Sequence, residues 1–566
     1  NTVRGQETGY ATLNPLNNIT EATFADGNLK VTTKNAPIHW GTHTSTLSMS
    51  SGKYYAEVTV ESTSGYPAFG VCDVQSTFTD ISWIGSLNPA ISYYGNFGVK
   101  YVNGASAASY GSNFGAGNTI GIAVDLDNLT VEFFKDGTSQ GLITGLTGNT
   151  EYVFGGSEYD TGSGVFLWNY GQKPFKFPPP DGFQPLTLAN VRPETVITRP
   201  DKFVSATIWD GNDVDGREID VGMSPDMIIV KARDYGSNWY WLSDTVRGTP
   251  NKLYPNSNTN EDTAPVYGQA DSFTSKGWIA GGGTHSTYPL NDNNSSLYDY
   301  VCWSWKAGGS AGTWNKDGVA FASAADVGLT GITSPATLVG ASIGTKQGFS
   351  IIRWNRGADS PSWSTGVIPH GLTQAPDFII TKNLGVNKGW MVFHQGKGTG
   401  RLYWNNNLTG DGSGYTTLPT DTHFTIDNTT DADSSNDCMS YCWHNVPGLQ
   451  KFGKYTGNNS SDGHFIELGF RPAIIIFKNI TTSGNNGHWV VLDNKRDPSN
   501  GTNNLLYLAS TTFTENTYTS NLPHGDFLSN GFKLRGSYVS NSDTFVYAAW
   551  AETPSSNLFG GQSNAR

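Results

Sequence analysis

The sequence predicts an all-β protein built from several domains. Short runs rich in Val, Ile, Thr, Tyr, Phe and Trp alternate at close intervals with clusters of Gly, Asn, Asp and Ser, a pattern typical of strands joined by turns. A helical 3.6-residue periodicity lasting more than two turns is absent. Many short strands with glycine-rich turns, in a chain of 566 residues, favour a series of sandwiches or barrels.

Composition and charge argue against several functional classes. Aromatic residues make up 13% of the chain and charged residues 15%, the opposite of a disordered composition. The formal net charge of −13 and the lack of any basic run argue against nucleic-acid binding, because phosphate contacts need clustered Lys and Arg. The longest apolar stretches, such as 473–477, are strand-sized, so we expect no membrane insertion. The first five residues lack the apolar core of a signal peptide.

The first structural unit is predicted from about Ala11 to Phe183. Its clearest strands lie in 52–60, 117–127 and 131–137. The last two strands are joined by a short Asp-Asn turn, and the second ends at an Asp-Gly pair that is typical of tight β-hairpins.

These segments resemble the SPRY (B30.2-like) family. A glycine, three apolar residues, Asp-x-Asp and a strand ending Phe-Phe-x-Asp-Gly follow one another from Gly121 to Gly137. The opening strand reads Gly-x-Tyr-Tyr-x-Glu-Val at 52–58, and 169–175 matches the closing segment. The resemblance covers about 160 residues. It implies a bent β-sandwich whose inter-strand loops bind protein or other ligands without catalysis.

The remainder of the chain repeats itself three times. Five landmarks recur in the same order: a strand that ends in Gly, a Pro-initiated apolar strand that ends in Lys, a strand containing Trp, a Leu-Tyr pair, and a final strand that closes on Trp after Cys or Ala. The lysines are Lys231, Lys382 and Lys478. The Trp residues, which we expect to lie in the core, are Trp239, Trp390 and Trp489 in the Trp-containing strand and Trp303, Trp443 and Trp550 at the close.

The repeat gives the domain organisation. Copies of about 100 residues are too long for solenoid units, so they predict tandem homologous β-sandwich-like domains. The predicted order is an SPRY-like β-sandwich (1–183), a Pro-punctuated linker (184–202), copy 1 (203–307), a small-residue-rich insertion or linker (308–348), copy 2 (349–450), and copy 3 with the C-terminal tail (451–566).

The repeats also resemble a module found in large structural proteins of tailed bacteriophages, often beside SPRY-like or lectin-like sandwiches. The terminal segments 547–554 and 563–566 contribute to this resemblance, which covers about 203–566. It implies a non-enzymatic virion protein on the tail or capsid surface, a tail fibre or related fibre. Its partners would be a host-surface glycan or protein receptor and other virion proteins, and fibres of this kind are usually homotrimers. The alternatives are a polysaccharide-degrading tailspike, a capsid decoration protein and a bacterial surface adhesin.

Candidate chemistry is sparse. The segment 340–344 matches the G-x-S-x-G pattern of a nucleophile elbow, but no helix follows Ser342, so we interpret it as a linker serine without a catalytic role. The acidic runs 210–216 and 427–433 allow a loop-bound Ca²⁺, although solvated turns are the favoured interpretation. Cys438 and Cys442 lack the second Cys/His pair of a zinc site. We therefore expect no cofactor and assign no metal ligands.

Ligand candidates come from the aromatic residues. Those found in one copy only, within polar and turn-rich surroundings, are Trp363 and Trp404; Tyr93 and Tyr94 of the first unit complete the set. A rigid apolar ring with polar partners is what sugar recognition uses. Core or intersubunit packing is the competing interpretation for each of them.

Overall fold

A computed structural model shows that the chain is all-β, as the sequence predicts. Three short 3₁₀ turns have described bounds, η2 (Ile84–Ser86), η3 (Pro200–Lys202) and η4 (Gly484–Gly487). The structure describes residues 9–17, 22–33, 40–76, 78, 82–148, 150–159, 163–187, 190, 196–235, 240–357, 365–427, 436–508, 514–515, 524–536, 542–556 and 562–563. Within these residues no helix is long and apolar enough to cross a membrane.

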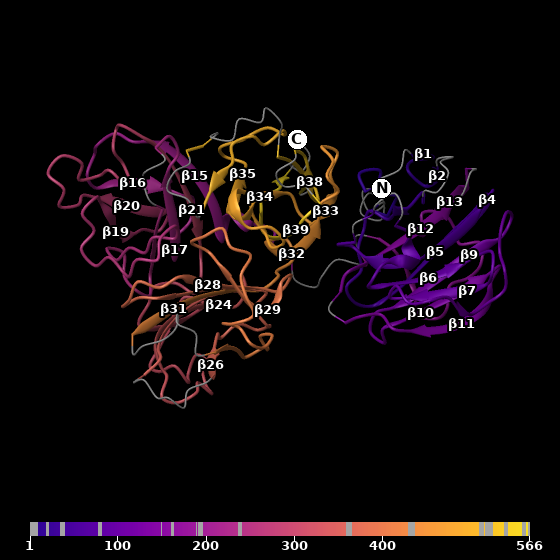
Figure 1. The fold of residues 1–566 in the computed structure, drawn as a ribbon, viewed down its shortest axis with the longest axis horizontal. Coiled ribbons are helices and arrows are strands. Elements are labelled where there is room, and N and C mark those ends of the chain that lie inside the picture. The colour runs from indigo at the N-terminus through magenta and orange to yellow at the C-terminus, as the bar shows by residue number, and fades with distance from the viewer. Residues whose placement is uncertain are drawn as a thin grey trace. The chain divides into compact units, whose positions relative to one another are not determined.

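The chain divides into two compact units (Figure 1). The N-terminal unit comprises 1–194 and groups with His464–Ile466, and the second unit comprises 195–463 and 467–566. By strand pairing, the short segment at 464–466 belongs to a sheet of the second unit.

The N-terminal unit is a sandwich of two sheets. The first sheet has the order β1 (Thr23–Ala25), β2 (Lys30–Thr32), β13 (Val165–Asn169), β4 (Lys53–Ser62), β9 (Thr119–Asp125), β10 (Thr130–Lys135) and β11 (Thr138–Thr144), with β14 (Gln184–Pro185) beside β4. The second has the order β3 (His43–Thr44), β12 (Tyr152–Tyr159), β5 (Tyr66–Asp73), β6 (Ala90–Tyr94), β7 (Val99–Val102) and β8 (Ala108–Ser109).

Alternating side chains of both sheets form the core of this unit. Val58, Ile122 and Trp168 of the first sheet pack with Phe69 and Phe154 of the second, and all five are fully buried. The second sheet is covered on its other face as well, where a smaller apolar cluster includes Cys72 and Ile84. Because both faces are occupied, β5 and β12 are buried along almost their whole length.

Two local predictions can be compared directly with this sandwich. Asp136 and Gly137 form the two-residue turn between β10 and β11, with φ angles of 48° and 80°, the left-handed conformation that a type I′ hairpin requires. The structure differs from the predicted linker at 184–202 in the first residues of that stretch. β14 pairs in parallel with β4, and Leu186 is buried in the core, so this stretch is part of the sandwich.

The second unit contains three main sheets with one strand order. Copy 1 has β15 (Val204–Asp210), β21 (Asp299–Trp305), β17 (Met227–Ala232) and β18 (Trp241–Asp244). Copy 2 has β25 (Phe349–Asn355), β31 (Asp437–Trp443), β27 (Phe378–Asn383), β28 (Trp390–His394) and β29 (Gly398–Tyr403). Copy 3 has β32 (Gln450–Thr456), β39 (Thr544–Ala551), β34 (Pro472–Asn479), β35 (Trp489–Asp493) and β36 (Leu506–Tyr507).

Smaller sheets accompany the main ones. They are β16 (Arg217–Asp220), β20 (Gly277–Gly281) and β19 (Gln269–Phe273); β26 (Thr365–Pro369) and β30 (His423–Asp427); β33 (Phe465–Glu467), β38 (Gly531–Leu534) and β37 (Gly525–Leu528); and β40 (Ser555–Ser556) with β41 (Gln562–Ser563). In copy 1, Ile228 and Val230 of the main sheet pack with Trp278 of the small sheet, whereas Ile229 belongs to a core shared by all three copies. The main sheets are therefore buried on both faces, which explains their continuous apolar strands.

The three repeated lysines lie at corresponding positions in the strand register. Lys231, Lys382 and Lys478 are each fully buried near the end of the central strand, and each Nζ donates to a main-chain carbonyl in the loop that follows. Burial lowers the pKa of Lys231 and of Lys478 to about 7. This agreement in register supports the interpretation of the sequence repeat as structural.

The register corrects two Trp assignments in copy 1. Met227 pairs with Trp305, as Phe378 pairs with Trp443. The closing Trp of copy 1 is therefore Trp305, and Trp303 lies two positions earlier on the same face of the strand.

In the Trp-containing strand, the residue that pairs with each repeated lysine shows which residues of the three copies are equivalent. Lys382 pairs with Trp390, whereas the corresponding neighbour of Lys231 is Tyr240. Trp239 lies outside the described residues.

The segment at 308–348 extends the sheet of copy 2. Its strands β22 (Trp314–Lys316), β23 (Val319–Phe321) and β24 (Thr337–Gly344) continue the order past β25, with β24 antiparallel to β25 and parallel to β22. The interpretation as a linker is wrong for this stretch, because its strands are hydrogen-bonded into the sheet and Ile343 is buried in the core of copy 2.

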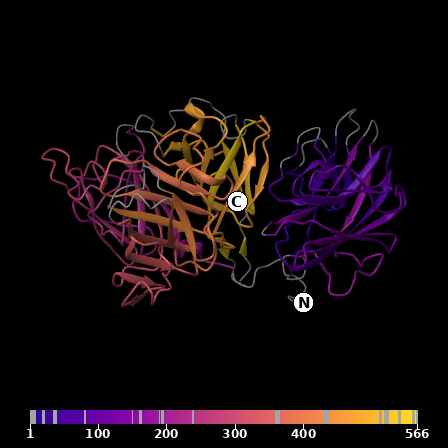
Figure 2. The same cartoon turned by 60° about the horizontal axis from the view of Figure 1, so that its bottom comes forward.

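The copies close a ring around a pseudo-threefold axis. Trp305, Trp443 and Trp550 meet at the centre, with ring centroids 6.4, 5.4 and 6.3 Å apart for the three pairs. Figures 1 and 2 show the copies, coloured magenta, orange and yellow, side by side around this centre. One chain thus has an internal pseudo-threefold arrangement.

The copies meet at three interfaces, here called seams, and two of the seams contain a buried Asp. Tyr441 of copy 2 donates its hydroxyl to Asp244 of copy 1 at 2.7 Å, and Trp303 of copy 1 donates its indole N–H to Asp493 of copy 3 at 3.1 Å. Each Asp also forms a fully buried ion pair with the Arg three residues later. Two equivalent positions therefore carry the same polar contact.

The third seam is chemically different. At the position of the two Asp residues copy 2 has His394, whose Nε2 donates to the Tyr547 carbonyl of copy 3 at 2.9 Å. Gln395 donates to the Phe452 carbonyl across the same seam at 2.7 Å. Burial lowers the pKa of His394 to about 4, so this contact is made by a neutral imidazole.

Candidate ligand-binding surface

The most distinctive surface feature of the N-terminal unit is a cluster of aromatic side chains on the outer face of its second sheet, here called the outer-face cluster. None of its rings is fully buried, and each ring contacts at least one other ring of the cluster. Its members are Trp40, Tyr66, Trp83, Tyr94, Phe97, Tyr101 and Tyr159.

Strand ends bring these rings together. Tyr66 begins β5 and lies directly opposite Tyr159 at the end of β12, and Tyr94 ends the neighbouring strand β6. Trp40 forms an isolated bridge with Tyr159, and Trp83 immediately precedes the 3₁₀ turn η2. Because side chains alternate between the faces of a strand, these strand ends place their rings on the outer face.

The rings are close, and three pairs of them are nearly parallel. Tyr66 and Tyr94 have centroids 6.1 Å apart at an interplanar angle of 12°, and Tyr94 and Phe97 are 5.9 Å apart at 14°. Trp40 and Trp83 stack at 4.6 Å and 12°. In contrast, the ring of Trp83 is tilted by 60° from that of Tyr94 and by 82° from that of Tyr101. Phe97 stands out from the surface with 68% of its area exposed. The cluster is thus a contiguous group of stacked and tilted rings, here also called the aromatic platform, with one prominent ring at its rim.

One tyrosine of this platform is influenced by a buried carboxylate. The pKa of Tyr94 is raised by burial and, to a smaller extent, by Tyr101, Tyr66 and Glu158. Glu158 is 3% exposed, and its Oε1 accepts hydrogen bonds from Thr63 at 2.7 Å and from the Gly65 N–H at 3.2 Å. Because Glu158 directly precedes Tyr159 on β12, its side chain leaves the strand on the opposite face.

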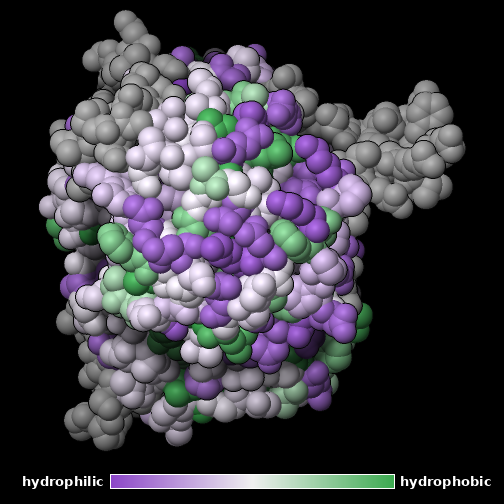
Figure 3. Space-filling view, turned by 90° about the vertical axis from the view of Figure 1, so that its right-hand side faces the viewer, coloured by the Kyte–Doolittle hydropathy of each residue, from purple (hydrophilic) through white to green (hydrophobic). Residues whose placement is uncertain are grey.

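The space-filling view in Figure 3 shows one face of the N-terminal unit. Apolar residues occur there as small separate groups among hydrophilic ones. A broad apolar patch of the kind that obligate partners bury is not seen on this face.

The four candidate ligand residues have different locations. Tyr93 is fully buried in the core of the sandwich, and its pKa is raised by burial to about 12. Tyr94, the next residue, points to the other face and belongs to the outer-face cluster. Trp404 is 2% exposed and packs on Trp489 of copy 3 at 4.8 Å, so its ring has no face to offer to an external ligand. Trp363 lies outside the described residues.

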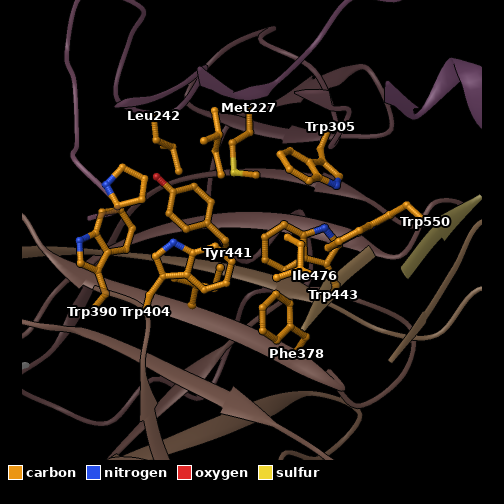
Figure 4. A pocket seen from close by; sticks show the side chains of 13 residues that line it. Met227, Leu242, Trp305, Phe378, Trp390, Trp404, Tyr441, Trp443, Ile476 and Trp550 are labelled. Atoms are coloured by element: carbon orange, nitrogen blue, oxygen red, sulfur yellow. The ribbon is translucent and has the colours of Figure 1, made fainter. Parts of the chain in front are cut away.

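A small cavity lies at the centre of the ring (Figure 4). Its volume is about 20 Å³, enough for roughly one water molecule. The side chains that line it are those of Met227, Ile229, Leu242, Pro255, Trp305, Phe378, Ile380, Trp390, Trp404, Tyr441, Trp443, Ile476 and Trp550. Because the lining is almost wholly apolar, the cavity is a packing gap on the pseudo-threefold axis and has too few polar groups to orient a ligand.

Ser342 lies neither in a nucleophile elbow nor in a linker, the two settings considered from the sequence. It lies within strand β24, is 1% exposed, and its Oγ donates to the Gly309 carbonyl at 2.7 Å. A nucleophile elbow needs a strained turn between a strand and a helix, which this strand does not provide.

The acidic runs have oxygens that are already engaged by the protein. Asp213 accepts from the Ser296 N–H at 2.9 Å, and Asp215 accepts from the Gly282 N–H at 2.8 Å. Of the second run, 428–433 lies outside the described residues. Among the residues that the structure describes, no group of three or more His, Cys, Asp or Glu is arranged to hold a metal ion, and the four cysteines are free and buried.

Comparison with known families separates the same two regions. Residues 199–554 match the family described as "Domain of unknown function (DUF7483)". The chain belongs to the DUF7483 family. Residues 53–154 of this DUF7483 protein match the SPRY domain family, so an SPRY domain lies near its N-terminus.

Relatives are found for the SPRY region. The DUF7483 protein is 33% identical over 146 residues to "E3 ubiquitin-protein ligase RKP" of Arabidopsis thaliana, covering 25% of this chain and 11% of that one. It is 30% identical over 151 residues to "ATP-dependent RNA helicase DDX1" of Xenopus laevis, covering 26% and 19%. The chain therefore spans less than a fifth of the length of either relative.

Solved structures that are similar to the SPRY region include "Crystal structure of human SPRY domain", at 16% identity and a TM-score of 0.23, covering 27% of this chain and 96% of that one. A second is "Crystal structure of the SPRY domain of human HERC1", at 17% identity and a TM-score of 0.25, covering 28% and 99%.

Proposed function

We propose that this protein is a non-enzymatic attachment protein on the surface of a tailed-bacteriophage virion, a tail fibre or related fibre, which recognises the host surface. The observation that carries the proposal is the partly exposed aromatic platform of the SPRY domain, with Phe97 at its rim. Exposed rings bordered by hydroxyl groups are suited to recognition by stacking and hydrogen bonding. The resemblance of the repeats to virion modules supports the viral setting.

The second unit would serve as a rigid support. Its main sheets are buried on both faces and joined at three polar seams, so the unit has little freedom to deform. In this proposal the SPRY domain supplies contact with the receptor, and the DUF7483 region supplies attachment to other virion proteins. Neither role needs a cofactor or a catalytic group.

A competition experiment with the full chain tests the proposal. The purified protein should bind host cells saturably and reduce the adsorption of the virus in proportion to its occupancy. The same protein after thermal unfolding is the control and should do neither. Failure of the folded chain to bind host cells would contradict attachment as its function.

Self-association as a homotrimer remains part of the proposal because it aligns three receptor sites. Multivalent attachment can raise weak binding by about 10²–10⁴ without any new contact. Light scattering on the full chain should give a mass near three times 61.0 kDa. A mass near 61.0 kDa would mean that the internal ring takes the place of a trimer.

A further inference from the structure

The arrangement of the outer-face cluster restricts what it can bind. Neighbouring centroids lie 4.6–6.1 Å apart in the pairs Trp40–Trp83, Tyr94–Phe97 and Tyr66–Tyr94, so these rings touch one another. An aromatic cage for an ammonium group needs rings around an open space. These rings leave no such space between them, so a ligand must lie on top of the platform.

The rings themselves restrict the charge of the ligand further. The electron-rich faces of aromatic rings repel anions, so a phosphate, a sulfated sugar or an acidic glycan is a poor match. Since the closely packed rings also leave no cage for an ammonium group, the ligand that fits is uncharged.

The chemical groups at the platform match those of a sugar ring. A pyranose has an apolar face of C–H groups that can lie on an aromatic ring, and hydroxyls at its edge that need polar partners. Phe97 offers the exposed ring at the rim, and Tyr66, Tyr94 and Tyr101 add hydroxyl groups beside their faces. Binding by stacking needs neither a deep pocket nor a charged group.

We propose that the outer-face cluster is a binding site for a neutral carbohydrate, with pyranose rings stacked on the aromatic platform. The site deepens the proposed function, on which it rests, by naming the class of receptor. Phe97 provides the exposed stacking face, and the tyrosine hydroxyls bond the sugar hydroxyls.

Two substitutions and one control test this proposal in the full chain. Phe97→Ala removes the rim ring at little risk to folding, because 68% of the side chain is exposed. Tyr94→Phe keeps the ring and removes the hydroxyl. Leu142→Ala is the control, since Leu142 is 60% exposed on β11 in the other sheet. The probes are a panel of neutral oligosaccharides and neutral polysaccharide purified from the host envelope, with heparin, choline and a polyproline peptide as competing ligand classes.

Phe97→Ala should weaken binding of the best neutral saccharide about 2- to 12-fold, the range expected for loss of one aromatic stacking partner. Tyr94→Phe should weaken it by a smaller factor, and Leu142→Ala should leave it unchanged. Lack of binding to every neutral saccharide, or equal binding by all three variants, would overturn the proposal. So would a loss, on Phe97→Ala, of binding to heparin, choline or polyproline alone.

The same variants separate this site from the function on which it rests. If the unchanged chain binds host cells and Phe97→Ala binds them equally well, attachment stands and the carbohydrate site is refuted. If the unchanged chain does not bind host cells, attachment itself fails, and saccharide binding by the purified protein then decides the site independently.

Discussion

The seam between copies 1 and 2 gives a quantitative test of the ring. Replacing Tyr441 by Phe keeps the buried ring and removes the hydroxyl that donates to Asp244 at 2.7 Å. Asp244 is fully buried and keeps its ion pair with Arg247 at 2.6 Å, so the variant loses one hydrogen bond to a charged group. Such bonds contribute about 1.5–3 kcal/mol. We expect the free energy of unfolding of the second unit to fall by that amount.

The size of the unit converts this loss into a measurable shift. A cooperative unit of roughly 350 residues has an unfolding entropy of about 0.7 kcal/mol/K, so the midpoint of thermal unfolding should fall by about 2–4 °C. Calorimetry of the full chain resolves this transition from that of the SPRY domain if the two units unfold separately.

Tyr240→Phe is the matched control for Tyr441→Phe. Tyr240 is equally buried in the second unit, and its hydroxyl has no hydrogen-bond partner among the described residues. Its substitution should leave the midpoint unchanged or slightly higher. Equal midpoints for the two variants would refute the role assigned to the Tyr441–Asp244 seam.

Three further predictions concern buried polar groups. Burial lowers the pKa of His394 from its usual 6.5 to about 4. The stability that the neutral imidazole contributes is therefore complete above pH 6.5 and is lost as the pH falls through 4. Denaturation midpoints measured from pH 8 to 4 should fall less steeply in His394→Gln than in the unchanged chain. Burial raises the pKa of Asp377 from its usual 3.8 to about 7. The contribution of this carboxyl group to stability is therefore complete below pH 3.8 and is lost as the pH rises through 7. Asp377→Asn should raise the unfolding midpoint at pH 8 and not at pH 4. Ser342→Ala should lower the free energy of unfolding by about 0.5–1.5 kcal/mol and change no binding activity, because among the described groups the Oγ bonds only the Gly309 carbonyl. Loss of a hydrolytic activity in this variant would contradict the assignment of Ser342 as a structural residue.

Local sequence signals predicted the strands and turns well. The Asp136-Gly137 pair predicted a hairpin because the left-handed backbone of a type I′ turn favours these residue types. The repeated lysines were aligned correctly because each ends an apolar strand of similar length. Signals of this kind depend on neighbouring residues alone.

Register between distant strands could not be predicted in the same way. Strand β21 has Trp303 and Trp305 on one face, and either fits the pattern of a closing Trp. Only the pairing of Met227 with Trp305 decides between them. The insertion around Ser342 was misjudged for a related reason, since small residues suit a linker and an inner strand alike.

The candidate site was the least predictable part. Trp404 is a candidate because it occurs in one copy only. The seams of the ring are not all alike, however, so a residue unique to one copy can pack at a seam. The outer-face cluster joins strand ends far apart in sequence, such as Tyr66 and Tyr159, and no local pattern links them. The alternation along 93–94 was the available signal, because it places one Tyr in the core and the next outside.

The central claim is attachment by binding without chemistry. Its most direct test incubates the purified full chain with polysaccharide from the host envelope and measures both the amount bound and the length of the polysaccharide chains. The account predicts saturable binding with chain length unchanged after prolonged incubation. Shortened chains would identify a depolymerase, and lack of binding would remove the glycan receptor, so either result would contradict the account.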